Sequence, residues 1–118
     1  MIQGKMLKKV SFNFKGKNIS IEARECKGLN KFFGLMFKNK EKTNALIFEF
    51  KKPVSFRIHS FFVFFSFIAV WIDESNKIIE IRRVKPFTFS IKTKKYYKRL
   101  LEIPLNKKYM KKVQHIFL

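Results

Sequence analysis

Short runs in which apolar and polar residues alternate recur along this chain, and this period of two most constrains its fold. It places the apolar side chains of each run on one face of a strand. Two such runs, at 9–14 and 19–23, flank the turn sequence KGKN at 15–18. A glycine-containing turn between alternating runs is typical of a β-hairpin, so we predict one near the start of the chain.

Further strands are predicted after residue 44. Residues 61–72 are almost continuously apolar, which predicts a strand buried on both faces or one that crosses between sheets. The other predicted strands are shorter, and each is an alternating or strand-length apolar run; they lie at 45–50, 54–59, 79–82, 87–92 and 97–103. The sixteen Phe residues suit such pleated, half-buried surfaces.

The last of these strands carries a polar face. We expect Tyr97, Leu101 and Ile103 on its buried face, with Lys98 and Glu102 on the opposite face. Glutamate is ordinarily solvated, so Glu102 is interpreted as a surface residue.

One short helix is predicted as well, because the apolar positions 29, 32, 33 and 36 have helical spacing and glycines 28 and 34 limit its length. The basic tail, 106–118, is left open as a short helix, an edge strand or a loosely ordered end. Together these elements predict a mainly β fold. We expect a compact β-sandwich of jelly-roll-like character or a partly closed barrel with one short helix, forming a single domain over 1–118.

The net charge of +19, from 27 Lys and Arg against 8 Asp and Glu, flanks an uncharged centre. It leaves two interpretations open: attraction of nucleic acid or another polyanion, and Lys-rich composition without a charged partner. In the first interpretation, Tyr96 or Tyr97 would offer a face on which bases stack, although core packing explains Tyr97 as well. The basic residues nearest to them are the candidate polyanion contacts: Lys92, Lys94, Lys95, Lys98, Arg99, Lys107, Lys108, Lys111 and Lys112.

Groups for catalysis or metal binding are sparse. Cys26 is the single cysteine and is interpreted as a buried reduced thiol, and with His59 and His115 it lacks metal-ligand spacing. No glycine-rich phosphate loop is present. We therefore expect neither cofactor nor enzyme activity, and a catalytic interpretation would require Glu102 or Glu80 to be buried beside His59.

No apolar stretch has the length of a secretory signal or a membrane span. The chain is thus expected to be cytoplasmic, as a monomer or weak dimer whose partner is unknown. The interpretation that follows is a non-catalytic binding or accessory module, with nucleic-acid binding through the Lys-rich surface as the alternative.

Eight pieces of the chain, over roughly residues 8–105, occur in a family-like order: GLMF at 34–37, ALIFEF at 45–50, PVSF at 53–56, HSFFVFF at 59–65, VWID at 70–73, KPF at 85–87, Tyr97, and LEIP at 101–104. In this order they resemble the domain of unknown function 192 family, also called uncharacterised protein family 0127. The resemblance implies a compact, mostly β sandwich of jelly-roll-like character and no particular activity, because the family has no established common function.

The chain also departs from the family's pattern. Many members have an acidic residue before the central strand, where this chain has Ile68 in the sequence SFI. A glycine usually follows the last strand, where this chain has Leu105 and Asn106. Any role that the acidic residue plays in relatives is therefore not expected here.

Overall fold

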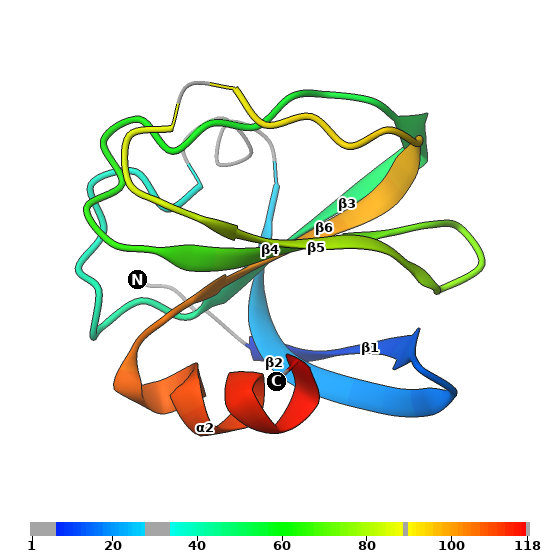
Figure 1. The fold of residues 1–118 in the computed structure, drawn as a ribbon, viewed down its shortest axis with the longest axis horizontal. Helices are drawn as coiled ribbons and strands as arrows, with labels where there is room; N and C mark the ends of the chain where they lie inside the picture. Colours follow the sequence, from blue (N-terminus) through cyan, green and yellow to red (C-terminus); the bar gives the residue numbers. More distant parts are fainter. Residues whose placement is uncertain (1–6, 28–33, 89, 118) are drawn as a thin grey trace.

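The computed structural model describes residues 7–27, 34–88 and 90–117, which form six strands and one helix (Figure 1). These elements run in the order β1 (Leu7–Phe14), β2 (Lys17–Cys26), β3 (Ala45–Val54), β4 (Phe67–Ile72), β5 (Ile78–Val84), β6 (Tyr97–Pro104) and α2 (Lys107–Phe117). The predicted mainly β fold is confirmed: the strands curl into a half-barrel that carries a short helix. In these ranges no helix is long and apolar enough to span a membrane.

The strands form one sheet in the order β1-β2-β3-β6-β4-β5. Neighbouring strands are antiparallel except for β2 and β3, which are parallel. The sheet curls far enough for the two edge strands to approach each other, because the Asn13 N–H donates to the Asn76 carbonyl at 3.0 Å, next to β5. The last strand along the chain, β6, thus occupies the middle of the sheet.

The predicted hairpin is confirmed as β1 and β2. Phe14 pairs with Lys17, so the loop consists of Lys15 and Gly16 alone. Both residues have positive φ, 51° and 79°. A two-residue loop with this backbone matches the right-handed twist of the strands that it joins.

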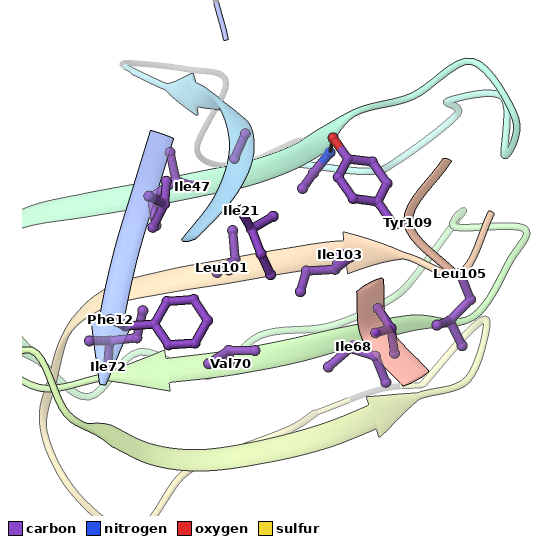
Figure 2. Close-up of a cluster of buried hydrophobic side chains, with 14 residues drawn as sticks. Phe12, Ile21, Ile47, Ile68, Val70, Ile72, Leu101, Ile103, Leu105 and Tyr109 are labelled. Atoms are coloured by element: carbon purple, nitrogen blue, oxygen red, sulfur yellow. Dashed lines mark hydrogen bonds between the residues drawn. The ribbon is translucent and has the colours of Figure 1, made fainter. Parts of the chain in front are cut away.

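A first hydrophobic cluster fills the concave side of the half-barrel (Figure 2). It brings together alternate side chains of β1, β2, β3, β4 and β6, such as Phe12, Val70 and Leu101, each fully buried. The helix α2 covers it with Tyr109 and Val113. Of the three alternatives for the tail, the structure therefore has the short helix.

Two polar side chains fasten α2 to the sheet. The Tyr109 hydroxyl accepts a hydrogen bond from the Ala45 N–H at 2.9 Å and donates one to the Glu22 carbonyl at 3.1 Å. The Asn106 side chain accepts from the Tyr109 N–H and donates to the carbonyls of Lys40 and Thr43. Asn106 is thus a buried N-terminal cap that also holds the loop before β3.

A second cluster lies on the opposite face of the sheet, because Phe67, Ala69 and Trp71 belong to it while the alternate residues of β4 belong to the first. All six residues of β4 are buried, which confirms a strand buried on both faces for this part of 61–72. Loops, not a helix, cover this second cluster in the described residues.

Three of the predicted strand segments are wrong. Residues 55–66 and the described residues of 85–92 form loops whose one ladder pairing is the isolated bridge between Ile58 and Ile91, so the strands predicted at 54–59, 61–66 and 87–92 are not found there. The reason lies in the backbone: Phe62 and Phe87 have φ of 56° and 57°, which interrupts an extended chain.

Two further expectations need correction. Tyr97 lies in the second cluster, opposite to Leu101, because the pairing of β3 with β6 shifts register between Glu49 and Val54. Glu102 is buried, since loops cover its face of β6. The helix predicted at 29–36 falls largely outside the described residues, and its last positions, 34–36, lie in a turn.

Candidate functional site

A pocket of about 380 Å³ opens on the second face of the sheet. Its floor comes from strands β3, β4 and β6, and its walls come from two loops that are far apart in the sequence. The floor residues are Phe48, Phe50, Phe67, Tyr97, Leu100 and Glu102, and the wall residues are Gly34, Leu35, Met36, Phe56, Arg57, Ile58, His59 and Val63. The lining is thus mostly apolar, with a few polar groups, as is typical of small-molecule sites.

Glu102 is the polar group of the floor, and its side chain is 5% exposed. In the described part of the chain, no hydrogen bond or ion pair reaches its carboxyl group. Burial raises the pKa of Glu102 to about 8, because the charged form loses its hydration without gaining a partner. At neutral pH the group is therefore mostly a neutral carboxylic acid, which can donate one hydrogen bond.

Gly34 brings the wall close to this carboxyl group. A Cβ atom at Gly34 would lie 3.4 Å from the Glu102 Oε1 atom and 3.5 Å from the Phe48 ring. Gly34 also has a φ of 48°, a conformation that costs side-chain-bearing residues energy. Glycine at this position therefore leaves the carboxyl oxygen room at the pocket wall.

Aromatic contacts fix the other side of the pocket. The Tyr97 hydroxyl donates a hydrogen bond of 2.8 Å to the Phe56 carbonyl, which ties the loop after β3 to β6. The Phe50 ring meets the rings of both Tyr97 and Phe56 edge-on, at 5.9 and 5.8 Å. Burial raises the pKa of Tyr97 to about 12, so its hydroxyl keeps its proton for this bond. The pocket is therefore largely preformed.

Two exposed basic residues stand at the rim. Arg57 donates a hydrogen bond to the Ser90 hydroxyl at 3.0 Å, and the His59 Nδ1 atom accepts one from the Phe61 N–H at 3.2 Å. An accepting Nδ1 leaves Nε2 as the ring nitrogen that carries the proton. The polar groups that a ligand would meet are thus cationic or neutral donors outside and a carboxyl group inside.

Cys26 lies in the second cluster beside this site. It is buried and free, as expected from the sequence. Burial raises its pKa to about 11, so the thiol is not ionised at neutral pH and is a poor nucleophile. In the described ranges no three His, Cys, Asp or Glu residues gather in a way that could hold a metal ion.

The nine candidate polyanion contacts do not form one surface. The loop before β6 carries Lys92, Lys94 and Lys95, and α2 carries Lys107, Lys108, Lys111 and Lys112, all exposed. Figure 1 shows α2 at one end of the molecule and this loop at the opposite end.

The two strand residues of the set are also in different surroundings. Arg99 is half-buried and donates hydrogen bonds to the Ser11 carbonyl and to Asn76, so it helps to hold the sheet edges together. Lys98 shares a shallow groove with Glu49, Asp73 and Glu74, which reduces its attraction for an anion. Nucleic-acid contact by this set stays a prediction.

Sequence reasoning missed Glu102 as a pocket residue, because Glu102 lies in an ordinary strand pattern. Its burial depends on loops more than thirty-five residues away along the chain. One chemical signal was present: a single carboxylate next to apolar residues in the last strand, in the sequence LLEIP. That pattern alone is compatible with both faces of a half-buried sheet.

Comparison with known proteins gives a family and a fold. The family model DUF192, described as "Uncharacterized ACR", matches residues 11–114 of the 118-residue chain. No curated protein matches the sequence.

Two solved structures have a similar fold. One is a protein of unknown function from Novosphingobium aromaticivorans DSM 12444, with 12% sequence identity and a TM-score of 0.71 over 93% of this chain and 81% of that one. The other is a "putative transcription regulator" from Sinorhizobium meliloti 1021, with 13% identity and a TM-score of 0.72 over 88% of this chain and 84% of that one. At these identities the likeness shows the fold alone.

Proposed function

The chain belongs to the DUF192 family of uncharacterised proteins, and from this premise we propose that it binds a small, largely apolar molecule in the pocket over β3 and β6. The observation that carries the proposal is the Glu102 carboxyl group, which lines the pocket while buried and without a partner among the described residues. An unpaired buried carboxyl group costs stability, and a ligand that hydrogen-bonds to it would recover part of that cost.

The lining narrows the chemistry of the ligand. Apolar and aromatic walls favour a ring or a short hydrocarbon. A mostly neutral carboxyl group favours a ligand atom that accepts a hydrogen bond, such as an amide carbonyl, or an amine that takes the proton and pairs with the carboxylate. A ligand carboxylate is disfavoured, because its charge would lose hydration in an apolar pocket.

The test uses three probes of matched size, benzamide, benzylamine and benzoate, with ¹H–¹⁵N spectra of the protein. Benzamide and benzylamine are expected to shift the amide signals of Gly34 and Leu100 with dissociation constants of about 1 mM, as for small fragments. Benzoate is expected to bind more weakly. Absence of shifts at the pocket for all three probes would contradict the proposal.

Two variants locate the binding. Met36→Trp places a large side chain from the half-buried wall into the pocket and should abolish the shifts. Glu102→Gln keeps the shape of the pocket and should abolish binding of benzylamine, which needs the carboxylate, while it retains binding of benzamide. Lys111→Gln, on the exposed face of α2, is the control and should bind like the wild type. Binding that survives Met36→Trp would place the probes elsewhere.

We propose this binding as non-catalytic. The condition for catalysis is half met, because Glu102 is buried in a pocket whose rim includes His59. His59 is however exposed, and its Nδ1 atom accepts a backbone hydrogen bond. Among the described lining residues Glu102 is the one carboxylate, so the pocket lacks the second carboxylate of an acid–base pair. Turnover of a bound probe that Glu102→Gln abolishes would overturn this view.

Nucleic-acid binding is the second candidate. It is supported by the +19 charge and by the description of the Sinorhizobium meliloti protein, which shares the fold. Binding of a duplex or single-stranded oligonucleotide should be measured across salt concentration, where loss between about 0.05 and 0.2 M indicates attraction by charge alone. Affinity that persists at about 0.2 M with a sequence preference would favour this candidate over the pocket ligand.

A further inference from the structure

Four phenylalanines gather on the surface in what we call the Phe patch: Phe37, Phe62, Phe64 and Phe87. They are 67%, 46%, 60% and 46% exposed. The Phe37 and Phe62 rings stack with centroids 5.0 Å apart, and Phe87 meets Phe62 and Phe64 edge-on at 6.2 and 5.3 Å. The rings are therefore contiguous, unlike the single exposed apolar residues of most surfaces.

The backbone holds this patch in a strained conformation. Phe37, Phe62 and Phe87 have positive φ, at 60°, 56° and 57°. A bulky side chain in the left-handed region is rare and costs energy, so neighbouring structure must enforce it. Such strain is often found at functional sites.

Ser60 joins two of the loops that carry these residues. Its side chain is fully buried, and its hydroxyl donates to the Lys85 carbonyl and accepts from the Thr88 N–H, both at 2.6 Å. Its carbonyl accepts from the Phe87 N–H at 2.8 Å, and the Phe62 carbonyl accepts from the Phe37 N–H at 2.8 Å. Three loops are thus joined into one platform that presents the rings outward.

The same three loops are positively charged. Residues 34–40, 55–66 and 85–96 contain no Asp or Glu, and their Lys and Arg side chains are exposed or half-exposed; these are Lys38, Lys40, Arg57, Lys85, Lys92, Lys94 and Lys95. Glu41 follows the first loop, but its carboxylate accepts a hydrogen bond from the Lys107 N–H at the start of α2. Lys38 directly follows Phe37, and Lys85 lies two residues before Phe87, so positive charge adjoins the Phe patch. An apolar patch with adjoining positive charge complements a surface that is apolar beneath an anionic layer.

We propose that the Phe patch docks on the surface of an anionic lipid bilayer, with the four rings below the headgroups and the basic residues of the three loops among them. A second copy of the chain fits less well, because the positive side chains next to the patch, Lys38 and Lys85, would face their own copies. Single-stranded RNA also fits less well, since base stacking needs separate free ring faces, and here the rings pack against each other.

The test is co-sedimentation of the full chain with vesicles of phosphatidylcholine and phosphatidylserine, or of phosphatidylcholine alone, at about 0.15 M salt. The double variant Phe62→Asn/Phe87→Asn removes two rings, and asparagine tolerates positive φ, so the loops should keep their conformation. The wild type is expected to prefer the anionic vesicles. The double variant should bind the anionic vesicles at least about tenfold more weakly, because its two missing Phe side chains no longer enter the bilayer.

Two charge variants form a matched pair. Lys38→Gln/Lys85→Gln removes two charges within two residues of Phe37 and Phe87 and should weaken vesicle binding on the order of tenfold. Lys111→Gln/Lys112→Gln removes the same charge from α2, at the opposite end of the molecule, and should weaken it much less.

Three results would overturn the proposal. The first is unchanged vesicle binding by the double Phe variant when its spectra show the wild-type fold. The second is an equal loss in both charge variants, which indicates attraction by net charge alone. The third is a concentration-dependent dimer, or tight binding of a uridine oligonucleotide, that only the double Phe variant abolishes.

Discussion

The two faces of the half-barrel sheet bury similar side chains, but a helix packs over one face and loops pack over the other. The first cluster lies under α2, and polar bonds from Tyr109 and Asn106 fasten that helix to the sheet. The second cluster lies under irregular loops, which leave a pocket and a carboxyl group without a partner in the described residues. A regular element with a matching apolar face closes a core, whereas loops on a comparable face leave room for a ligand.

The largest expected effect is the pH dependence of stability that the buried Glu102 causes on the loop-covered face. With an ordinary pKa of 4.5 when unfolded and about 8 when folded, the unfolded chain releases its proton first as the pH rises. The stability of the wild type is therefore fully present below about pH 4.5, falls between about pH 4.5 and 8, and is level above that. Glu102→Gln should remove this dependence, with a gain of as much as about 5 kcal/mol at pH 8.5 and little change at pH 4.5.

The measurement is urea unfolding of both proteins across this pH range, with Glu74→Gln as the exposed control. The wild type and Glu102→Gln share every other titrating group, so the difference between their two curves isolates Glu102. Parallel curves for the wild type and Glu102→Gln would show that the carboxyl group is ionised in the folded protein.

The next largest effect compares two neighbours on β6. Leu101 belongs to the first cluster and Leu100 to the second, where it lines the pocket. Leu101→Ala should lower the free energy of unfolding by about 4 kcal/mol, because it opens a closed cavity. Leu100→Ala should cost about 2 kcal/mol, since its space joins an existing pocket. Equal losses in urea unfolding would contradict the difference between the two faces.

A smaller effect tests how α2 is fastened. Asn106→Ala removes the cap of α2 and leaves the Thr43 carbonyl without its side-chain donor, so it should cost about 2 kcal/mol. Asn39→Ala removes an exposed turn contact to the Glu41 N–H and should cost about 0.5 kcal/mol or less. Thermal unfolding of the two variants gives the comparison. Similar melting temperatures would show that the Asn106 hydrogen bonds do not stabilise the attachment of α2.

The smallest effect is a gain on the loop-covered face. Phe87→Asn replaces a bulky side chain at positive φ and should raise the free energy of unfolding by about 1 kcal/mol. Phe64→Asn, at an exposed ring without positive φ, should give no such gain. A loss of stability in Phe87→Asn would show that its ring contacts outweigh the backbone strain.

The difference between the faces also explains what could be predicted from the sequence. The hairpin of β1 and β2 follows from local alternation and a two-residue turn, and β4 follows from its apolar run. The continuous apolar run failed at 61–66, and the alternation failed at 54–59 and 87–92. Phe62, Phe64 and Phe87 are exposed, whereas Val63 and Ile91 are buried loop residues. A period of two records which residues are apolar, and here it does not distinguish a buried face from an exposed patch.

The candidate site was beyond local reasoning for a related reason. Glu102 looks like the solvated position of a strand until the loops at 34–36 and 56–63 are placed over it. Their position depends on long-range bonds such as the one from the Tyr97 hydroxyl to Phe56, which no local pattern encodes. The resemblance to the DUF192 family, in contrast, is confirmed, because it rests on the order of many short pieces along the chain.

The central place of β6 has a consequence for how the chain is made. Because β6 lies between β3 and β4, neither of these strands has its full set of neighbours until the residues through Pro104 have left the ribosome. The growing chain can form the β1–β2 and β4–β5 hairpins early, since these pair nearby segments. Their apolar faces must then wait for the last strand, and the high positive charge of the nascent chain would help to keep neighbouring copies apart in that interval.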